Sequence, residues 1–367
     1  MSREITPMIG LCMIVKDEEA VIERCLKSVL PLIDTWTIVD TGSSDRTPVL
    51  VEQLLQDRPG QLLHFPWVNF AHNRNQSLQY NRERCQYHLI LDADDWIEAS
   101  PAFKWPELKD DCYALEIHYQ GIVHRRPQLL KSSLAWCYEG VVHEQPHAPD
   151  AGHGGTVEGL VYHCATGESA RARDPFRFHR DAALLEEELK RRPGDPRSVF
   201  YLAQSYRDGG RLRDAVETYR QRTVLGGWSQ EIYYSHLQIG RLLTRLGAPA
   251  SEVIGSYQAA FEVDPTRSEA PLELARHYRL QGQYQLALVW ARQAHSRQLP
   301  RDGLFLEIDA YGWKLLDELA LACHYTGNHQ EAVCWGRMVL SQCHLEAELP
   351  RLQTNLDFYE KGLKAIS

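Results

Sequence analysis

Positive charge and long apolar runs are both scarce in this chain. The formal net charge is −9 over 367 residues and no basic run occurs, whereas nucleic-acid binding needs a basic face. The first 15 residues hold only a short apolar run, 8–15, without a small-residue cleavage pattern. We therefore expect neither a secretion signal nor a membrane span. The composition predicts a globular cytoplasmic protein that does not bind nucleic acid.

The cysteines lack any pairing pattern. The nine residues are scattered between positions 12 and 343, are odd in number and form no CxxC pair. Disulfide frameworks and zinc sites use regular or closely spaced cysteines. We therefore expect reduced thiols that pack as small apolar side chains.

The two common phosphate-binding loops are also missing. No GxGxxG follows the first apolar run, and no GxxxxGK[ST] occurs. Dinucleotide-binding folds and P-loop enzymes hold phosphate with the backbone of these loops. Any phosphate bound here must instead be held by a metal ion and side chains.

A cluster of carboxylates offers such a metal site. The apolar run 89–91 is followed by Asp92, Asp94 and Asp95, which places them at the carboxyl end of a buried strand, where open α/β sheets bind ligands. Three carboxylates so close together are costly unless a cation neutralises them. Asp oxygens suit Mg²⁺ or Mn²⁺. The cluster indicates metal-assisted chemistry on a nucleotide, with an acidic turn as the alternative.

The first half of the chain alternates apolar strands with amphipathic helices. Strands are predicted over 9–15, 35–39, 61–65 and 87–91, with helices beginning at Asp17, at Pro48 and at Ala71. Continuous apolar strands separated by helices imply a mostly parallel sheet covered on both faces. After Trp96 only short strand-like segments occur, 113–119 and 128–131. They predict a mixed-sheet extension that ends near His163.

The second half carries an internal repeat. A small residue recurs four times and is followed each time, seven positions later, by glycine. The first member lets paired helices approach closely and the glycine closes the turn between them. The small residues are Ala203, Gly240, Ala275 and Ala320, and the glycines are Gly210, Gly247, Gly282 and Gly327. Residues 198–343 resemble the tetratricopeptide repeat family, with an insertion near 299–311.

Four short motifs in the correct order resemble the family 2 glycosyltransferases, which have the GT-A fold. They are 13–18 (MIVKDE), 39–47 (VDTGSSDRT), 71–75 (AHNRN) and 91–95 (LDADD). The fold class implied is an α/β GT-A domain, Rossmann-like with a mostly parallel sheet, followed by an all-α tetratricopeptide repeat solenoid. The predicted boundaries are 1–173 for the transferase domain, 174–197 for a connecting helix, 198–345 for the repeats and 346–367 for a helical tail. This arrangement is similar to bacteriocin peptide S-glycosyltransferases.

The resemblance assigns the donor side of a site. It implies that Asp40 accepts the N3–H of uracil, that Arg74 holds the diphosphate and that Asp92 lies near the ribose. Asp94 would bind the metal. From the residues alone, Asp40 and Arg74 also fit a capping carboxylate and an exposed helix arginine, whereas Asp95 fits only a turn or supporting position.

The acceptor side is assigned to a later segment, 136–147. Inverting transfer needs a carboxylate that takes the acceptor's proton, and the resemblance favours Glu144 for it, with Glu139 as the rival. His143 would position the acceptor or the base. His163 resembles the late histidine that completes metal coordination in many GT-A enzymes, and a histidine satisfied within the core is the alternative.

These expectations define an enzyme that transfers a hexose from a UDP-sugar, with Mn²⁺ or Mg²⁺, and inverts the anomeric carbon. The concave face of a repeat solenoid suits an extended peptide or protein acceptor. Two alternatives remain open: transfer to a lipopolysaccharide or other glycan, and a scaffold with a degenerate, non-catalytic transferase domain. The solenoid equally fits the interface of a homodimer.

Overall fold

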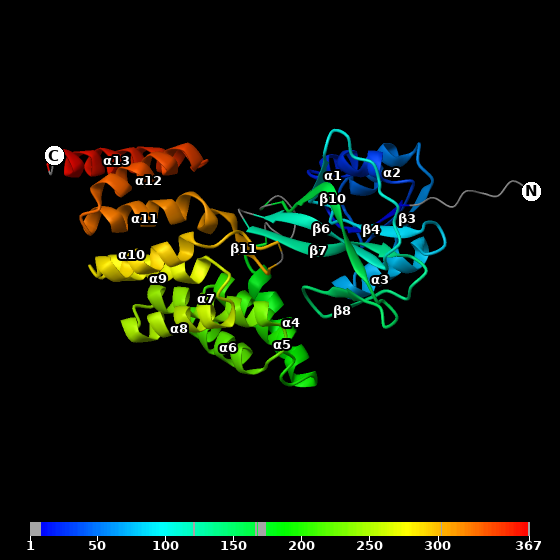
Figure 1. Cartoon of the computed structure of the whole chain (residues 1–367). Coiled ribbons are helices and arrows are strands. Elements are labelled where there is room, and N and C mark those ends of the chain that lie inside the picture. Colours follow the sequence, from blue (N-terminus) through cyan, green and yellow to red (C-terminus); the bar gives the residue numbers. More distant parts are fainter. Residues whose placement is uncertain (1–8, 120–121, 166, 168–173, 302, 366–367) are drawn as a thin grey trace, which may run out of the picture. The chain divides into compact units, whose positions relative to one another are not determined.

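The computed structural model describes residues 9–119, 122–165, 167, 174–301 and 303–365. The chain forms two compact units, Met1–Pro193 and Gly194–Ser367, and each is described by itself. Figure 1 labels their helices and strands. No helix within the described ranges is both long and apolar enough to cross a membrane.

The first unit is built on a mixed sheet with the strand order β3-β2-β1-β4-β7-β6-β10-β5. The first four strands in this order are parallel to one another. β7 is antiparallel to both β4 and β6, β10 is parallel to β6, and β5 is antiparallel to β10. The strands are β1 (Ile9–Val15), β2 (Thr35–Asp40), β3 (Gly60–His64), β4 (Tyr87–Ile90), β5 (Trp96–Ala99), β6 (Cys112–Tyr119), β7 (Ile122–Lys131) and β10 (Gly154–His163). The predicted parallel sheet with a mixed extension is confirmed.

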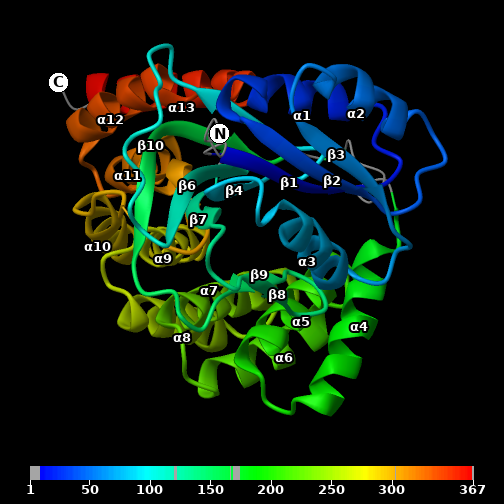
Figure 2. The same cartoon turned by 90° about the vertical axis from the view of Figure 1, so that its right-hand side faces the viewer.

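Helices cover the parallel part of the sheet on both faces. Figure 2 shows α1 and α2 on one side and α3 on the other. Leu11 and Met13 of β1 pack in one core cluster with Ile22 of α1, whereas Cys12 between them packs with Leu78 of α3. A strand buried on both faces must be apolar at every position, which explains its unbroken apolar run. The helices of the whole first unit are α1 (Ile22–Val29), η1 (Leu30–Leu32), α2 (Thr47–Leu55), α3 (Phe70–Asn81) and α4 (Arg177–Arg191).

The start of α1 differs from the sequence prediction. The helix begins at Ile22, not at Asp17, and Asp17 has a left-handed backbone with φ 55°. Its carboxylate accepts hydrogen bonds from the backbone and hydroxyl groups of Ser44, at 2.7 and 3.1 Å, and its N–H donates to Ser43. Contacts with the loop after β2 therefore override the local helix signal and fasten two strand ends together.

A short hairpin supplies the remaining strands of this unit. β8 (Cys137–Glu139) pairs antiparallel with β9 (Gln145–His147). The connection between them contains Gly140 and His143, both at positive φ. This turn carries the segment in which the acceptor-side residues were predicted.

The second unit consists of antiparallel helix pairs, as the repeat pattern predicted. All four turn glycines have positive φ, between 67° and 82°, a conformation that glycine adopts without strain. Gly240 lies so close to the ring of Tyr257 that an added Cβ would come within 2.4 Å of it. The helices are α5 (Pro196–Asp208), α6 (Leu212–Val224), α7 (Ser229–Arg245), α8 (Ala250–Val263), α9 (Glu269–Leu280), α10 (Tyr284–His295), α11 (Trp313–Tyr325), α12 (His329–Gln342) and α13 (Leu349–Lys364).

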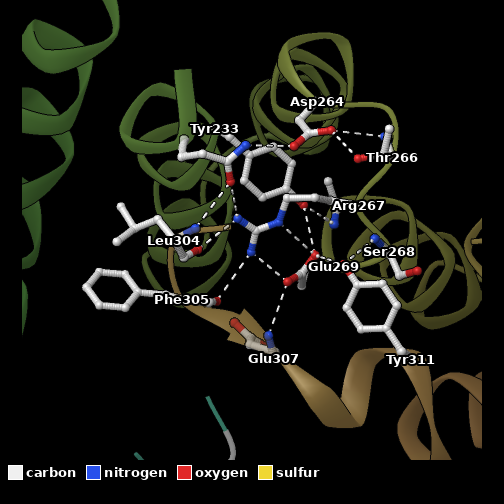
Figure 3. Close-up of polar contacts among 12 residues, drawn as sticks. Tyr233, Asp264, Thr266, Arg267, Ser268, Glu269, Leu304, Phe305, Glu307 and Tyr311 are labelled. Carbon is white, nitrogen blue, oxygen red and sulfur yellow. Dashed lines mark hydrogen bonds and ion pairs between the residues drawn. The ribbon is translucent and has the colours of Figure 1, made fainter. Parts of the chain in front are cut away.

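The predicted insertion lies between α10 and α11 and is held by a buried ion pair (Figure 3). Arg267 and Glu269 are fully buried and 2.6 Å apart. The guanidinium of Arg267 also donates to the carbonyl of Leu304, at 2.8 Å, and Glu269 accepts from Tyr311. These bonds satisfy both charges and tie the insertion to the repeats. The insertion contains the short segments β11 (Leu306–Glu307) and η2 (Ile308–Tyr311), and η3 (Glu346–Glu348) precedes α13.

Candidate active site

The carboxylate cluster forms the turn between β4 and β5. Asp92 and Asp94 are partly exposed and Asp95 is buried. Helix α1 holds the backbone of this turn, because the thiol of Cys25 contacts the carbonyl of Asp92 at 3.4 Å and Arg24 donates to the carbonyl of Asp94 at 2.9 Å. The carboxylates of Asp92 and Asp94 thus project from a fixed turn at the carboxyl end of a parallel strand.

Tyr162 fixes the same turn from β10. Its buried hydroxyl donates to Asp95 at 2.6 Å and accepts from the backbone N–H of Asp92 at 3.2 Å. The backbone N–H of Ala165 donates to the other oxygen of Asp95, at 2.8 Å. Burial, together with the neighbouring charges of Asp92 and Asp94, raises the pKa of Asp95 to about 7. Asp95 therefore supports the turn, in agreement with its predicted role.

Arg74 joins the donor-side and acceptor-side residues. One terminal nitrogen of its guanidinium lies 2.5 Å from Asp92 Oδ1, and Nε lies 2.5 Å from Glu144 Oε1. The exposed fraction of the side chain is 11% for Arg74, 9% for Glu144 and 32% for Asp92. Two carboxylates from segments far apart in the chain therefore share one nearly buried cation. Arg74 is not the exposed helix arginine of the alternative interpretation, and its contact with the diphosphate stays a prediction.

The motif 71–75 explains why Arg74 points into this site. Asn73 is buried and bonds the preceding loop through Val68 and Pro66. The Asn75 side chain accepts from the N–H of Tyr138, at 2.6 Å, and donates to the carbonyl of the same residue, at 3.2 Å. These two asparagines fasten the start of α3 to the loop before it and to β8, so that the arginine between them lies across the site.

The two candidate bases differ in their surroundings. Glu144 has a nearly buried side chain bonded to Arg74, whereas Glu139 is exposed and pairs across the hairpin with Gln145. His143 is exposed on the turn before Glu144, with φ 52°. The structure brings Glu144 together with Arg74 and Asp92, and the roles of Glu144 and His143 stay predictions.

Asp40 lies at the end of β2 and is already engaged in local hydrogen bonds. Its side chain is 5% exposed and accepts from the N–H and the hydroxyl of Ser43, at 3.1 and 2.5 Å. A ring nitrogen of His64 lies 3.2 Å from its other oxygen. At the start of α2, the N–H of Thr47 is bound by Asp45 and not by Asp40. The contact of Asp40 with uracil stays a prediction.

His163 lies among aromatic groups. Its ring stacks on Trp96 with centroids 5.1 Å apart, and the ring of His118 approaches edge-on at 5.5 Å. Its Nε2 is 3.1 Å from a carboxylate oxygen of Glu98. These contacts tie the histidine to both neighbouring strands, β5 and β6, and its role as a metal ligand stays a prediction.

The carboxylate turn suits a metal whose coordination is shared with a substrate. No group of three or more His, Cys, Asp or Glu side chains in the described ranges is arranged to hold an ion. Mg²⁺ needs only one or two protein carboxylates when substrate phosphates and water supply the other ligands. The partly exposed carboxylates of Asp92 and Asp94 fit that kind of site.

Sequence reasoning missed two side chains at this site. Tyr162 and Arg126 belong to β10 and β7, and the guanidinium carbon of Arg126 lies 5.3 Å from the centre of the Tyr162 ring. The only signal available was strand alternation, which places Tyr162 on the same side of its strand as Leu160. That signal gives the face of a side chain but not its partner.

The fold and site define a GT-A-like domain followed by tetratricopeptide-type helix pairs, and comparison with known proteins agrees. Residues 11–103 match the family described as glycosyl transferase family 2. The first unit therefore contains a family 2 glycosyltransferase domain, as the four motifs predicted, and this supports glycosyltransferase activity in general.

A further relative and two solved structures are also similar to parts of this chain. A TPR repeat-containing protein of Synechococcus elongatus is 28% identical over 78% of this chain and 74% of its own length. Among solved structures, the MamA protein is 21% identical, with a TM-score of 0.37 over 45% of this chain and 81% of that one. A thermophilic TPR protein of Thermus thermophilus is 19% identical, with a TM-score of 0.36 over 49% and 91%. The similarity to bacteriocin peptide S-glycosyltransferases stays a prediction.

Proposed function

We propose that this protein is a metal-dependent glycosyltransferase that moves a hexose from a UDP-sugar to a peptide or protein acceptor. The observation that carries the proposal is that Arg74 bonds both Asp92 and Glu144. Each hydrogen bond has a nitrogen–oxygen distance of 2.5 Å. It holds a carboxylate of the metal-binding turn and a carboxylate suited to proton transfer on either side of one cation. Donor and acceptor chemistry require such a pair within one site.

Asp94 would hold Mg²⁺ or Mn²⁺ directly, with His163 as a further candidate ligand, and Asp92 would lie near the ribose of the donor. The ion supplies positive charge that stabilises the leaving diphosphate. Glu144 takes the proton of the acceptor's hydroxyl or thiol while that atom attacks the anomeric carbon from the face opposite the diphosphate. The guanidinium of Arg74 keeps the Glu144 carboxylate in a fixed orientation. Attack from the opposite face inverts the anomeric carbon.

The nucleotide and acceptor assignments complete the proposal. Asp40, at the end of β2, would accept the uracil N3–H, and His143 would position the acceptor beside Glu144. A repeat solenoid offers a concave face suited to an extended chain, which favours a polypeptide acceptor in the cytoplasm. Mass spectrometry of candidate peptides and glycans, incubated with a panel of nucleotide sugars, identifies both substrates. Binding of UDP-sugar without any transfer or hydrolysis would instead support a non-catalytic scaffold.

The decisive test replaces the proposed base. Glu144→Gln keeps the shape of the side chain but cannot accept a proton, so kcat should fall about 10²-fold to 10⁴-fold. UDP binding, measured by calorimetry, should change little. Glu139→Gln is the matched control, because Glu139 lies on the same hairpin but is exposed. Loss of turnover in the control with retention in Glu144→Gln would assign the base to Glu139.

A further inference from the structure

Arg126 projects from β7 toward the carboxylate turn. β7 lies between β4, which leads into the turn, and β6. The guanidinium carbon of Arg126 lies 5.3 Å from the centre of the Tyr162 ring, and the hydroxyl of that ring bonds both Asp92 and Asp95. Arg126 is therefore one side chain away from both ends of the turn.

One donor of the Arg126 guanidinium is unpaired within the described ranges. Its Nε is buried and has no hydrogen-bond partner within the described ranges. The guanidinium lies over the ring of Tyr162. Burial acts to lower the pKa of Arg126, but Tyr162 and Asp92 raise it above its ordinary value. The side chain is thus a cation near the turn, and its buried Nε donor has no partner among the described residues.

Three other buried arginines among the described residues donate hydrogen bonds from their guanidinium groups. Arg267 donates to a carboxylate, a side-chain amide and two carbonyls (Figure 3). Arg222 donates to Glu231 and to two carbonyls, and Arg74 has its two carboxylates. Leaving a buried donor without a partner is energetically costly, because the donor has lost its hydration and gained no hydrogen bond. A guanidinium kept in that state beside a ligand-binding turn is expected to gain its partner from a ligand.

We propose that Arg126 binds the diphosphate of the nucleotide-sugar donor, the role that the family resemblance gave to Arg74. The guanidinium of Arg74 is instead occupied in holding Asp92 and Glu144. The inference rests on the proposed function and deepens it. A guanidinium matches the geometry of phosphate oxygens and donates to two of them at once. When the bond from the anomeric carbon to the diphosphate oxygen breaks, its electron pair passes to the diphosphate. The acceptor atom forms the new bond and its proton passes to Glu144. Arg126 stabilises the charge that develops on the leaving group.

The experiment compares ligands with and without phosphate. Calorimetry with UDP, GDP and dTDP, with and without Mg²⁺, identifies the nucleoside diphosphate that the wild type binds, and NMR measures the matching nucleoside. Arg126→Gln should weaken the diphosphate about 10-fold to 100-fold and change the nucleoside less than about twofold. Arg126→Lys keeps the charge without the fork and should fall between. Arg125→Gln is the control, because it removes a cation next to Arg126 that pairs with the exposed Glu158.

Each other result overturns the inference. If the nucleoside and its diphosphate weaken together, Arg126 supports the whole site and does not contact phosphate. If neither weakens, the diphosphate is bound elsewhere, and the proposed function stands. If the wild type binds none of the three diphosphates, the proposed function fails and this inference fails with it. Should Arg126→Gln not fold, the same comparison with Arg126→Lys decides between these results.

Discussion

Removal of the Arg74 guanidinium is expected to destabilise the first unit. Arg74→Gln leaves the carboxylates of Asp92 and Glu144 without their shared cation. Removing one partner of a buried ion pair costs about 3 to 5 kcal/mol. Glu144, with a side chain 9% exposed, meets that condition, whereas Asp92 is 32% exposed and regains part of its hydration. We therefore expect a loss of about 3 kcal/mol, near the lower end of that range.

This loss translates into a measurable melting shift. For a unit of this size, 1 kcal/mol moves Tm by roughly 2 to 4 °C, so Arg74→Gln should lower Tm by about 6 to 12 °C. Differential scanning calorimetry of the full chain is the assay. Arg84→Gln is the control, because Arg84 is exposed and bonds Gln61 on the surface, and it should change stability by less than about 0.5 kcal/mol.

A double variant tests the cause of the loss. If the unpaired Glu144 carboxylate is what destabilises Arg74→Gln, adding Glu144→Gln should restore about 1 to 2 kcal/mol, since the second change removes the uncompensated charge. A shift in Tm below about 2 °C for Arg74→Gln, or a double variant no more stable than the single one, would refute the reasoning.

The remaining predictions concern the metal, the repeats and pH. Asp94→Asn should abolish transfer and keep the fold, and EDTA should do the same until Mg²⁺ or Mn²⁺ is added back, whereas full activity in EDTA would contradict metal dependence. Gly240→Ala should cost about 1 to 3 kcal/mol, because the new Cβ would lie 2.4 Å from the Tyr257 ring. Gly255, on α8, has open space around it, so Gly255→Ala should raise the free energy of unfolding by about 0.5 to 1 kcal/mol. Equal changes in Tm for the two variants in calorimetry would contradict this explanation. Asp95, whose pKa rises from 3.8 to about 7 on folding, binds a proton in the folded state that the unfolded chain has released. Stability should therefore fall as pH rises from about 4 to 7. Asp95→Asn should flatten this dependence in urea titrations, and an unchanged slope would show that another group titrates.

The sequence by itself determined the elements and their order. The unbroken apolar run 9–15 predicted β1, and mostly apolar runs predicted β2 and β4, because a parallel strand covered by helices on both faces is buried on both sides. The repeated glycines predicted the four turns between paired helices, because a left-handed turn residue favours glycine whatever surrounds it. Both patterns depend on a few neighbouring residues, so they can be recognised without knowledge of the fold. The four family 2 motifs were recognisable for the same reason, since each is a short continuous segment.

The tertiary structure alone decided which side chains meet. Arg74 and Glu144 are 70 residues apart in the sequence, and neither motif predicts that the two side chains form an ion pair. The start of α1 was misplaced because hydrogen bonds with Ser43 and Ser44, on another loop, hold Asp17 in a left-handed turn.

The role of Arg126 could not be predicted from the sequence, because a missing hydrogen-bond partner shows only in the folded structure. Strand alternation fixes the face on which a side chain lies. The register between strands and the closure of loops then decide which charges share a site, and these depend on the packing of the whole domain.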